Sequence, residues 1–346
     1  MKKAYLVLEN EMVFEGYRIG SEKDSVGELV FNTGVVGYIE MLTDASYYGQ
    51  IVMQTFPLVG NYGMIEEDMG SKPALFGYVV RELCEEPSNF RTDYTLDKFL
   101  KDNDIPGICG VDTRALTRII RENGVMNAKI CSEVPADFTD IKNFKIVNAV
   151  SAVSGAEKTV EGEGKTKVAL INYGEKTALV NELTNRGCEV TVYPHNTKAE
   201  DIQGYDGVVL SGGPGDPSEN TFEIEQIAKL CGKLPIFAVG LGHQLLALAV
   251  GGKTGKLKYG HRGGNQPVKD LVGTRTYITS QNHGYVVESV PNAKVIYENA
   301  NDGTCEGLEY EGIKAFSVQF NPETANGPHD TGFLFDRFIK TMGGEN

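Results

Sequence analysis

The second half of the chain alternates short apolar runs with amphipathic stretches. Residues 168–172 form an apolar run that ends near Gly174 and predicts a buried strand. The stretch 176–186 places Leu179 and Leu183 on one face and stops at Gly187, which predicts a helix. Three further runs predict strands at residues 189–193, 208–210 and 235–239. Strands separated by helical segments predict a parallel sheet covered on both faces, with sites at the carboxyl ends of its strands.

The first half has a different pattern, in which strand-like runs accompany one clearly marked helix. Asp112 can cap the start of this helix, an apolar stripe that includes Leu116 and Ile120 follows, and Gly124 stops it. Between the two halves, residues 151–167 are small and polar, which predicts a linker or an extended crossing segment.

These patterns together predict an α/β protein with two domains. We expect an N-terminal mixed α/β domain at residues 1–150, a linker at 151–167 and a Rossmann-like domain with a mostly parallel sheet at 168–346. A length of 346 residues is enough for two domains that each bury a core.

Charge and composition narrow the range of partners. The net charge of −14 repels phosphate backbones, so nucleic acid is not an expected partner. The longest apolar tract, residues 234–252, contains His243, Gln244 and four glycines, which is typical of strand, turn and helix rather than of a membrane span. Six cysteines without paired spacing indicate reduced thiols in a cytoplasmic protein and favour neither disulfides nor a zinc site.

Two turns follow predicted strands of the second domain. The first, Ser-Gly-Gly-Pro-Gly-Asp-Pro at 211–217, can present backbone N–H groups to a developing negative charge, and it can equally be a plain turn from strand to helix. The second, Ala-Val-Gly-Leu-Gly-His-Gln at 238–244, has the layout of a nucleophile elbow. The nucleophile of such an elbow lies two residues before the last glycine, and this position is Gly240, which has no side chain.

A third segment, Ser-Val-Gln-Phe-Asn-Pro-Glu at 317–323, holds a possible catalytic carboxylate. Glu323 could orient a general base, but Asn321 stands where that base would be, and an amide does not titrate. The histidines at 195, 243, 261, 283 and 329 have no spacing that indicates a replacement base, and Cys231 is expected near the opposite edge of the sheet.

These segments carry a resemblance to a known family. The second half resembles class I glutamine amidotransferase domains, and the whole chain resembles the small subunits of carbamoyl-phosphate synthetase. The stretches that match in family order include FNTGVVGYIEMLTDASYYGQIV, GVDTRALTRIIRENG, LSGGPGDP, GLGHQLLALAVGGKT, GHRGGNQPVKD, QNHGYVV and GPHDTGFLFDRF.

The resemblance implies a reaction in which an elbow cysteine attacks glutamine, with a histidine as acid–base group and a glutamate orienting it. The ammonia released would pass to a large subunit that uses bicarbonate and ATP, in a heterodimer that serves arginine or pyrimidine biosynthesis. Here the family pattern G-x-C-x-G-H-Q reads AVGLGHQ, and H-P-E reads N-P-E, so Gly240 and Asn321 are degenerate and Glu323 alone is retained. Removing such a nucleophile costs about 10⁶ in kcat, or roughly 8 kcal/mol of barrier reduction.

The resemblance also implies a glutamine pocket that is better kept than the reaction centre, with Leu241 contributing its backbone N–H. The matching positions are Ser46, Gly213, Gly215, Leu241, Gln244, Asn282, Gly284 and Tyr285. No cofactor and no metal are expected in this chain, since ATP and Mg²⁺ would belong to the large subunit.

We expect a subunit that has lost its glutaminase activity and supports synthesis from free ammonia. Two alternatives remain open: a non-enzymatic, glutamine-sensing regulatory subunit, and a conventional glutamine-hydrolysing subunit whose nucleophile lies elsewhere. Engineered inactivation is a further alternative, but Ala238 also departs from the family pattern without adding inactivation, which favours natural drift.

Overall fold

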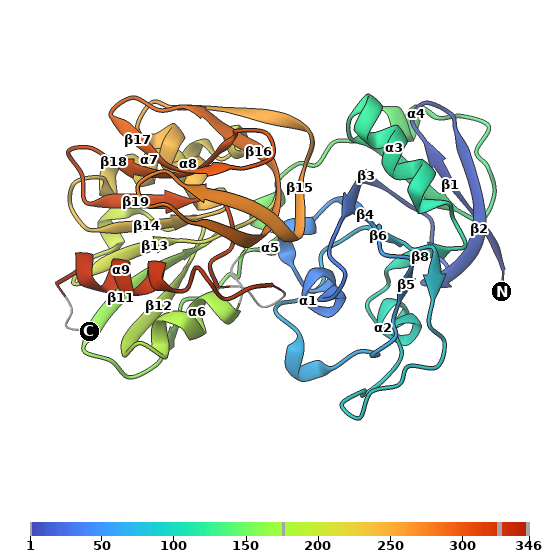
Figure 1. The fold of residues 1–346 in the computed structure, drawn as a ribbon, viewed down its shortest axis with the longest axis horizontal. Coiled ribbons are helices and arrows are strands. Elements are labelled where there is room, and N and C mark those ends of the chain that lie inside the picture. Colours follow the sequence, from blue (N-terminus) through green and yellow to red (C-terminus); the bar gives the residue numbers. More distant parts are fainter. Residues whose placement is uncertain (1, 175–176, 324–326, 344–346) are drawn as a thin grey trace. The chain divides into compact units, whose positions relative to one another are not determined.

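The computed structural model describes residues 2–174, 177–323 and 327–343. It divides the chain into two compact units, Met1–Val147 and Asn148–Asn346. The fold is α/β, with mixed sheets (Figure 1). None of the described helices is long and apolar enough to cross a membrane.

The first unit is built around a closed β-barrel with the strand order β1-β2-β8-β6-β4-β3-β9. Its strands are β1 (Lys3–Leu8), β2 (Val13–Gly20), β3 (Ser25–Asn32), β4 (Gln50–Gln54), β6 (Gly77–Val79), β8 (Pro106–Cys109) and β9 (Met126–Cys131), with β5 (Leu58–Val59) and β7 (Glu82–Leu83) forming a separate pair. Its helices are α1 (Tyr38–Leu42), α2 (Leu96–Asp102), α3 (Thr113–Asn123) and α4 (Thr139–Lys142), with short 3-10 turns at η1 (Ala45–Tyr47) and η2 (Glu66–Asp68).

The marked helix of the first half is α3, as predicted. The Asp112 carboxylate accepts a hydrogen bond from the Ala115 N–H, and Gly124 ends the helix with φ +96°. Leu116 and Ile120 are buried on its inner face. A capping carboxylate and a terminal glycine with positive φ are therefore readable from sequence because both act on neighbouring residues.

The second unit contains a ten-stranded sheet with the order β10-β12-β11-β13-β14-β19-β18-β17-β15-β16. Its strands are β10 (Thr159–Glu161), β11 (Thr166–Asn172), β12 (Cys188–Pro194), β13 (Gly207–Leu210), β14 (Ile236–Val239), β15 (Lys253–Asp270), β16 (Thr276–Ser289), β17 (Ala293–Asn299), β18 (Cys305–Tyr310) and β19 (Ala315–Val318). Its helices are α5 (Ala149–Val153), α6 (Thr177–Thr184), α7 (Thr221–Leu230), α8 (Leu241–Ala249) and α9 (Phe333–Thr341), with 3-10 turns at η3 (Ala199–Asp201) and η4 (Pro217–Glu219).

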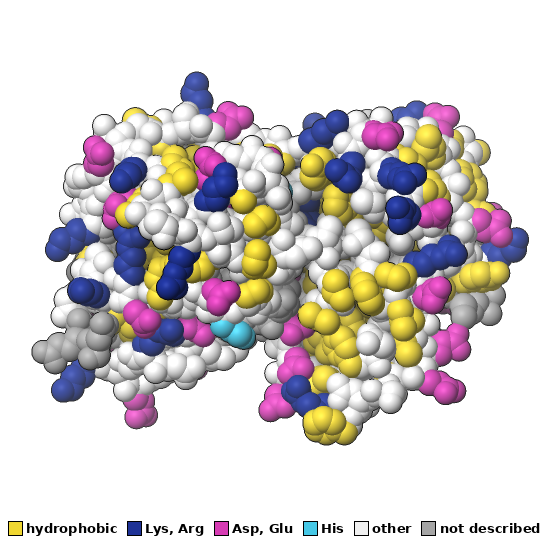
Figure 2. Space-filling view, viewed as in Figure 1, with side chains coloured by type: hydrophobic (Ala, Val, Ile, Leu, Met, Phe, Trp, Pro, Cys, Tyr) yellow, Lys and Arg dark blue, Asp and Glu magenta, His cyan; other side chains and the backbone are white. Residues whose placement is uncertain are grey.

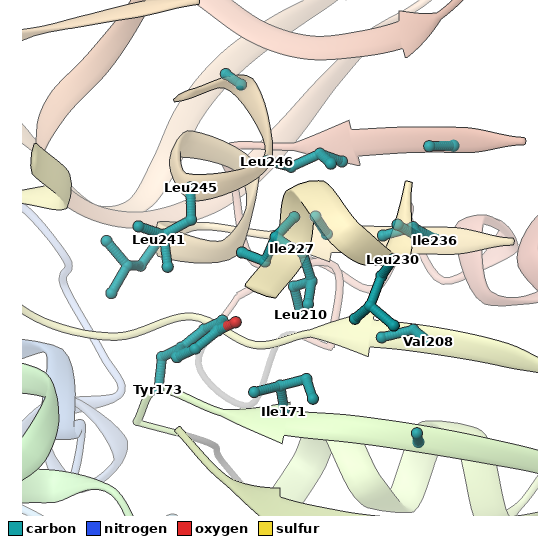
Figure 3. Packing of buried hydrophobic residues seen from close by; sticks show 14 of the residues in the cluster. Ile171, Tyr173, Val208, Leu210, Ile227, Leu230, Ile236, Leu241, Leu245 and Leu246 are labelled. Carbon is teal, nitrogen blue, oxygen red and sulfur yellow. The ribbon is translucent and has the colours of Figure 1, made fainter. Parts of the chain in front are cut away.

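Helices cover both faces of the parallel part of this sheet (Figure 1). The side chains of β11 point alternately to the two faces. Ala169 and Ile171 join the hydrophobic cluster beneath α7 and α8, whereas Val168 and Leu170 join the cluster beneath α6 and α9. In Figure 3, Leu241, Leu245 and Leu246 of α8 belong to the same packed group as Ile171 and Leu210. This packing holds the first turn of α8 against the carboxyl ends of the central strands.

Two features differ from the sequence predictions. Residues 151–167 belong to the second unit, where β10 pairs antiparallel with β12, so this segment adds an edge strand rather than forming a separate linker. Half of the large sheet is antiparallel, from β19 through β18, β17 and β15 to β16.

The predicted helix at 176–186 appears as α6, Thr177–Thr184, and Lys176 lies outside the described residues.

Candidate active site and its missing groups

The candidate site lies at the point of the parallel sheet where the order in which successive strands are added reverses. Strand β11 has β12 on one side and β13 on the other, so the loops after β11 and β13 flank a topological switch point, where α/β folds place their ligands. The two loops touch. A Cβ on Gly213 would lie 2.3 Å from the carbonyl oxygen of Tyr173, so only glycine fits this loop.

The elbow itself is present at the end of β14. Gly240 has φ +56° and ψ −113° and precedes α8, whose first turn receives no side-chain cap. Its N–H donates to the Val318 carbonyl at 2.9 Å, and the Gly242 N–H donates to the Ser211 carbonyl at 3.0 Å. These bonds tie the turn to strand β19 and to the glycine loop after β13.

The elbow carries a hydrogen atom where a nucleophile would project. A Cβ built on Gly240 would lie 3.3 Å from the Gly212 Cα and 4.0 Å from the Gln319 carbonyl oxygen. The position therefore has room for a small side chain, provided that the Gly212 backbone moves by a few tenths of an ångström. Cys231 lies before β14, at the end of α7, whereas Gly240 follows that strand, so this thiol is on the opposite side of the strand as predicted.

The base position sits on the strand next to the elbow. Strands β14 and β19 are parallel neighbours that pair Val239 with Val318, so residues 240 and 319–321 leave the same edge of the sheet. The Asn321 N–H donates to the Ser280 carbonyl of β16 at 2.9 Å. Glu323 follows two residues later and is buried. The three positions implied by the family resemblance therefore share one edge, but neither a nucleophile nor a titrating base occupies it.

The predicted pocket residues of the second unit cluster around this edge. Gly213 lies against Leu241, since a Cβ on the glycine would be 2.9 Å from the leucine Cδ2. The Gln244 amide donates to the Tyr285 carbonyl at 2.8 Å, on the strand that also carries Asn282 and Gly284. Gly215 adopts φ +90° in the loop after β13.

Ser46 lies in the first unit. It is half-buried in η1, and its N–H donates to the Asp44 carboxylate at 2.9 Å. Its hydrogen bond to Asp44 lies within the first unit, so its predicted contact with glutamine remains a prediction.

Gln319 and Ser317 are buried polar residues next to the elbow that were not among the predicted site residues. The Gln244 Nε2 also donates to the Gln319 Oε1 at 2.9 Å, and both amides are buried. His243 is fully buried, with its Nδ1 2.7 Å from the Ser317 hydroxyl. The alternation of residues 317, 319 and 321 along one strand face was the signal that could have placed Ser317 and Gln319 beside Asn321.

The burial of His243 has an electrostatic consequence. Removing the imidazolium from water is costly, which lowers the pKa of His243 to about 3 from an ordinary value near 6.5. His243 is therefore neutral at physiological pH. It stabilises the first turn of α8 through its bond to Ser317 and cannot act as a general base near pH 7.

Fold and site together define an amidotransferase architecture of class I. Residues 169–341 match the family model described as Glutamine amidotransferase class-I, and residues 6–130 match the model described as Carbamoyl-phosphate synthase small chain, CPSase domain.

Similar proteins extend over the full chain. A protein of Clostridium perfringens named carbamoyl phosphate synthase small chain is 50% identical over 98% of this chain and 99% of its own. One of Listeria monocytogenes with the same name is 47% identical over 100% and 98%. A pyrimidine-specific small chain of Halalkalibacterium halodurans is 47% identical over 98% and 96%. The chain belongs to the family of carbamoyl-phosphate synthase small chains.

The geometry of the elbow predicts the effect of restoring its side chain on stability. Gly240→Cys places an L-residue at φ +56° and crowds Gly212, which we expect to lower the free energy of unfolding by about 1–3 kcal/mol. Chemical denaturation of both chains measures the difference. Gly240→Ala is the matched control, because it has the same backbone strain without a thiol. Clear stabilisation by either substitution would contradict the strained-elbow interpretation.

The depressed pKa of His243 predicts a pH dependence of stability. Below about pH 6.5 the unfolded chain binds a proton on this imidazole that the folded chain excludes, so stability falls as the pH falls toward about 3. Between pH 7.5 and 5.5 this residue should remove about 1.4 kcal/mol. We expect His243→Asn to be less stable at pH 7.5 but to lack this part of the pH slope, as measured by denaturation at both pH values. Equal slopes in the two chains would mean that His243 is protonated when folded.

Proposed function

We propose that this chain is a carbamoyl-phosphate synthase small subunit whose own glutaminase activity has been lost. Its large-subunit partner then makes carbamoyl phosphate from free ammonia, and this chain stabilises or regulates that partner. The observation that carries the proposal is Gly240 at the tip of a fully formed elbow, with Asn321 at the base position on the neighbouring strand.

The side-chain chemistry at residues 240 and 321 supports the loss of glutaminase activity. Attack on the glutamine amide needs a thiolate at residue 240, and water in its place would need a base that Asn321 cannot supply. The backbone of the glycine loop and the first turn of α8 can still polarise a carbonyl, but such donors leave only a small residual rate when nucleophile and base are gone. His243 cannot substitute, because it is buried and neutral.

A large-subunit partner is supported by the family and by the surface of the first unit. Hydrophobic side chains gather on the face of this unit that Figure 2 shows. Large apolar residues of the same unit are unusually exposed, with Val35 at 61%, Val36 at 66% and Phe90 at 98%. Apolar side chains that form a contiguous exposed patch are typical of protein interfaces, whereas singly exposed ones are not.

A second candidate function is a glutamine-sensing regulatory subunit. It is favoured by the retained pocket scaffold, in which Gln244 is anchored to Tyr285 and Gly213 is sterically required. Such a subunit would bind L-glutamine without cleaving it and would change the activity of the large subunit with ammonia.

Paired assays of the purified two-subunit complex test the proposal. We expect carbamoyl phosphate from ammonium but not from glutamine, with glutamate release at background. Gly240→Ala is the control: it strains the elbow but removes no nucleophile, so its complex should still make carbamoyl phosphate from ammonium and release no glutamate. Glutamine binding by calorimetry, with altered ammonium-dependent activity, would favour the sensor. Robust glutamate release by the unsubstituted complex would refute the proposal and favour a conventional hydrolysing subunit.

A further inference from the structure

A buried cluster of metal-type side chains lies in the antiparallel half of the large sheet, and the Tyr285 carbonyl connects it to Gln244 of α8. It consists of His261 on β15, His283 on β16 and Glu306 on β18, whose donor atoms all lie within 4.8 Å of one another. His261 and His283 are a cross-strand pair, with ring centroids 4.9 Å apart. Glu306 is completely buried, so its charge needs compensation.

Hydrogen bonds fix which atoms of the two histidines face the centre of the cluster. The His261 Nε2 lies 2.9 Å from the Asp302 carboxylate, and the His283 Nδ1 lies 2.9 Å from the Tyr285 carbonyl oxygen. Both partners are acceptors, so each of these ring nitrogens carries the proton. The remaining atoms, Nδ1 of His261 and Nε2 of His283, then carry lone pairs of the kind that bind metals. The His261 Nδ1 lies 3.4 Å from the Asn299 Nδ2, a long hydrogen bond that a metal ion would replace.

The carboxylate of Glu306 likewise has one atom held by a hydrogen bond and one without such a bond. Its Oε1 accepts a hydrogen bond from the Asn299 Nδ2 at 2.9 Å, while its buried Oε2 has no hydrogen-bond partner among the described residues. One oxygen is therefore held in place and the other is available. A ligating carboxylate that is itself hydrogen-bonded is a regular feature of metal sites.

A fourth acceptor completes the set. The Gln281 Oε1 lies 3.0 Å from the His283 Nε2, so in the tautomer that donates from Nδ1 to the Tyr285 carbonyl two acceptors face each other. The His261 Nδ1 lies 3.5 Å from the Glu306 Oε1. Neighbouring ligand atoms on a tetrahedral ion with bonds of about 2.0–2.1 Å are about 3.4 Å apart. The His283–Gln281 separation of 3.0 Å is shorter than that value. The His261–Glu306 separation of 3.5 Å is measured to the oxygen that Asn299 holds. A cation bound between the His283 Nε2 and the Gln281 Oε1 would remove the repulsion of their lone pairs.

We propose that His261, His283 and Glu306, with the amide oxygen of Gln281, form a closed structural site for a zinc-type divalent cation. Two imidazoles and a carboxylate are a donor set that suits zinc. With four protein ligands and no open position, the site is structural. It ties β15, β16 and β18 together, and through the Tyr285 carbonyl it supports Gln244 in the first turn of α8. This metal departs from the sequence expectation that the chain holds none.

Metal analysis of the full-length chain tests the proposal. The chain is purified without a polyhistidine tag or chelator, and elemental analysis should find close to one zinc per chain. Glu306→Gln should lose the metal, and Asp302→Asn, which leaves all four ligands in place, should weaken zinc binding 10–100-fold. His195→Asn is the matched control, because His195 pairs with Glu223 at 2.6 Å elsewhere in the same unit and should not affect metal content.

A second measurement keeps the test decisive if Glu306→Gln fails to fold. Chelator-treated wild-type chain should gain roughly 5–10 °C in Tm at zinc concentrations about 100-fold above Kd. Cobalt(II) should give the visible absorption of a tetrahedral site without a thiolate charge-transfer band, since no cysteine is a ligand. Absence of bound metal together with an unchanged Tm in zinc would overturn the proposal and mean that hydrogen bonds alone hold the cluster together. Equal zinc content in Glu306→Gln and wild type would also overturn it.

Discussion

The backbone turn between β14 and α8 is the constraint on which the site depends. It bends within one residue, at φ +56°, and is held by bonds to Val318 on one side and Ser211 on the other. The leucines of α8 fix the helix to the central strands beneath it (Figure 3). The turn therefore persists without a catalytic side chain. In families that keep a nucleophile here, a strained L-residue is tolerated because the surrounding packing dictates its conformation. With glycine the strain disappears and so does the reacting atom.

This separation of scaffold from chemistry explains how the chain can remain a recognisable family member. The glycine loop after β13 is required by contact with Tyr173, and β14 and β19 are required by the sheet. These elements serve folding as well as catalysis. In the proposed function, Gly240 and Asn321 lack the reacting groups but keep the hydrogen bonds of their backbone N–H groups to the Val318 and Ser280 carbonyls.

Much of the parallel half of the second unit was predictable from sequence. Strands β11 to β14 are short apolar runs bounded by turn residues, and α6 carries a helical stripe, as does α3 of the first unit, so their signals are local. The strand β10 was missed because it is three exposed residues whose pairing with β12 is not encoded in their own pattern. The antiparallel strands were missed for a similar reason: β15 spans 18 residues with irregular register, and mixed burial obscures its period. The elbow was predictable because its signal is one short segment, whereas His261, His283 and Glu306 come from three separate strands and have no common spacing.

The most direct measurement is the search for a covalent γ-glutamyl intermediate on this polypeptide. The full-length chain in complex with its partner is mixed with L-glutamine, quenched in acid and analysed by intact-protein mass spectrometry. The doubly substituted chain Gly240→Cys/Asn321→His serves as the positive control, because it restores the sulfur and the base on the same scaffold. The account predicts an adduct on the control and none on the natural chain. An acyl adduct on the natural chain would contradict the loss of glutaminase chemistry.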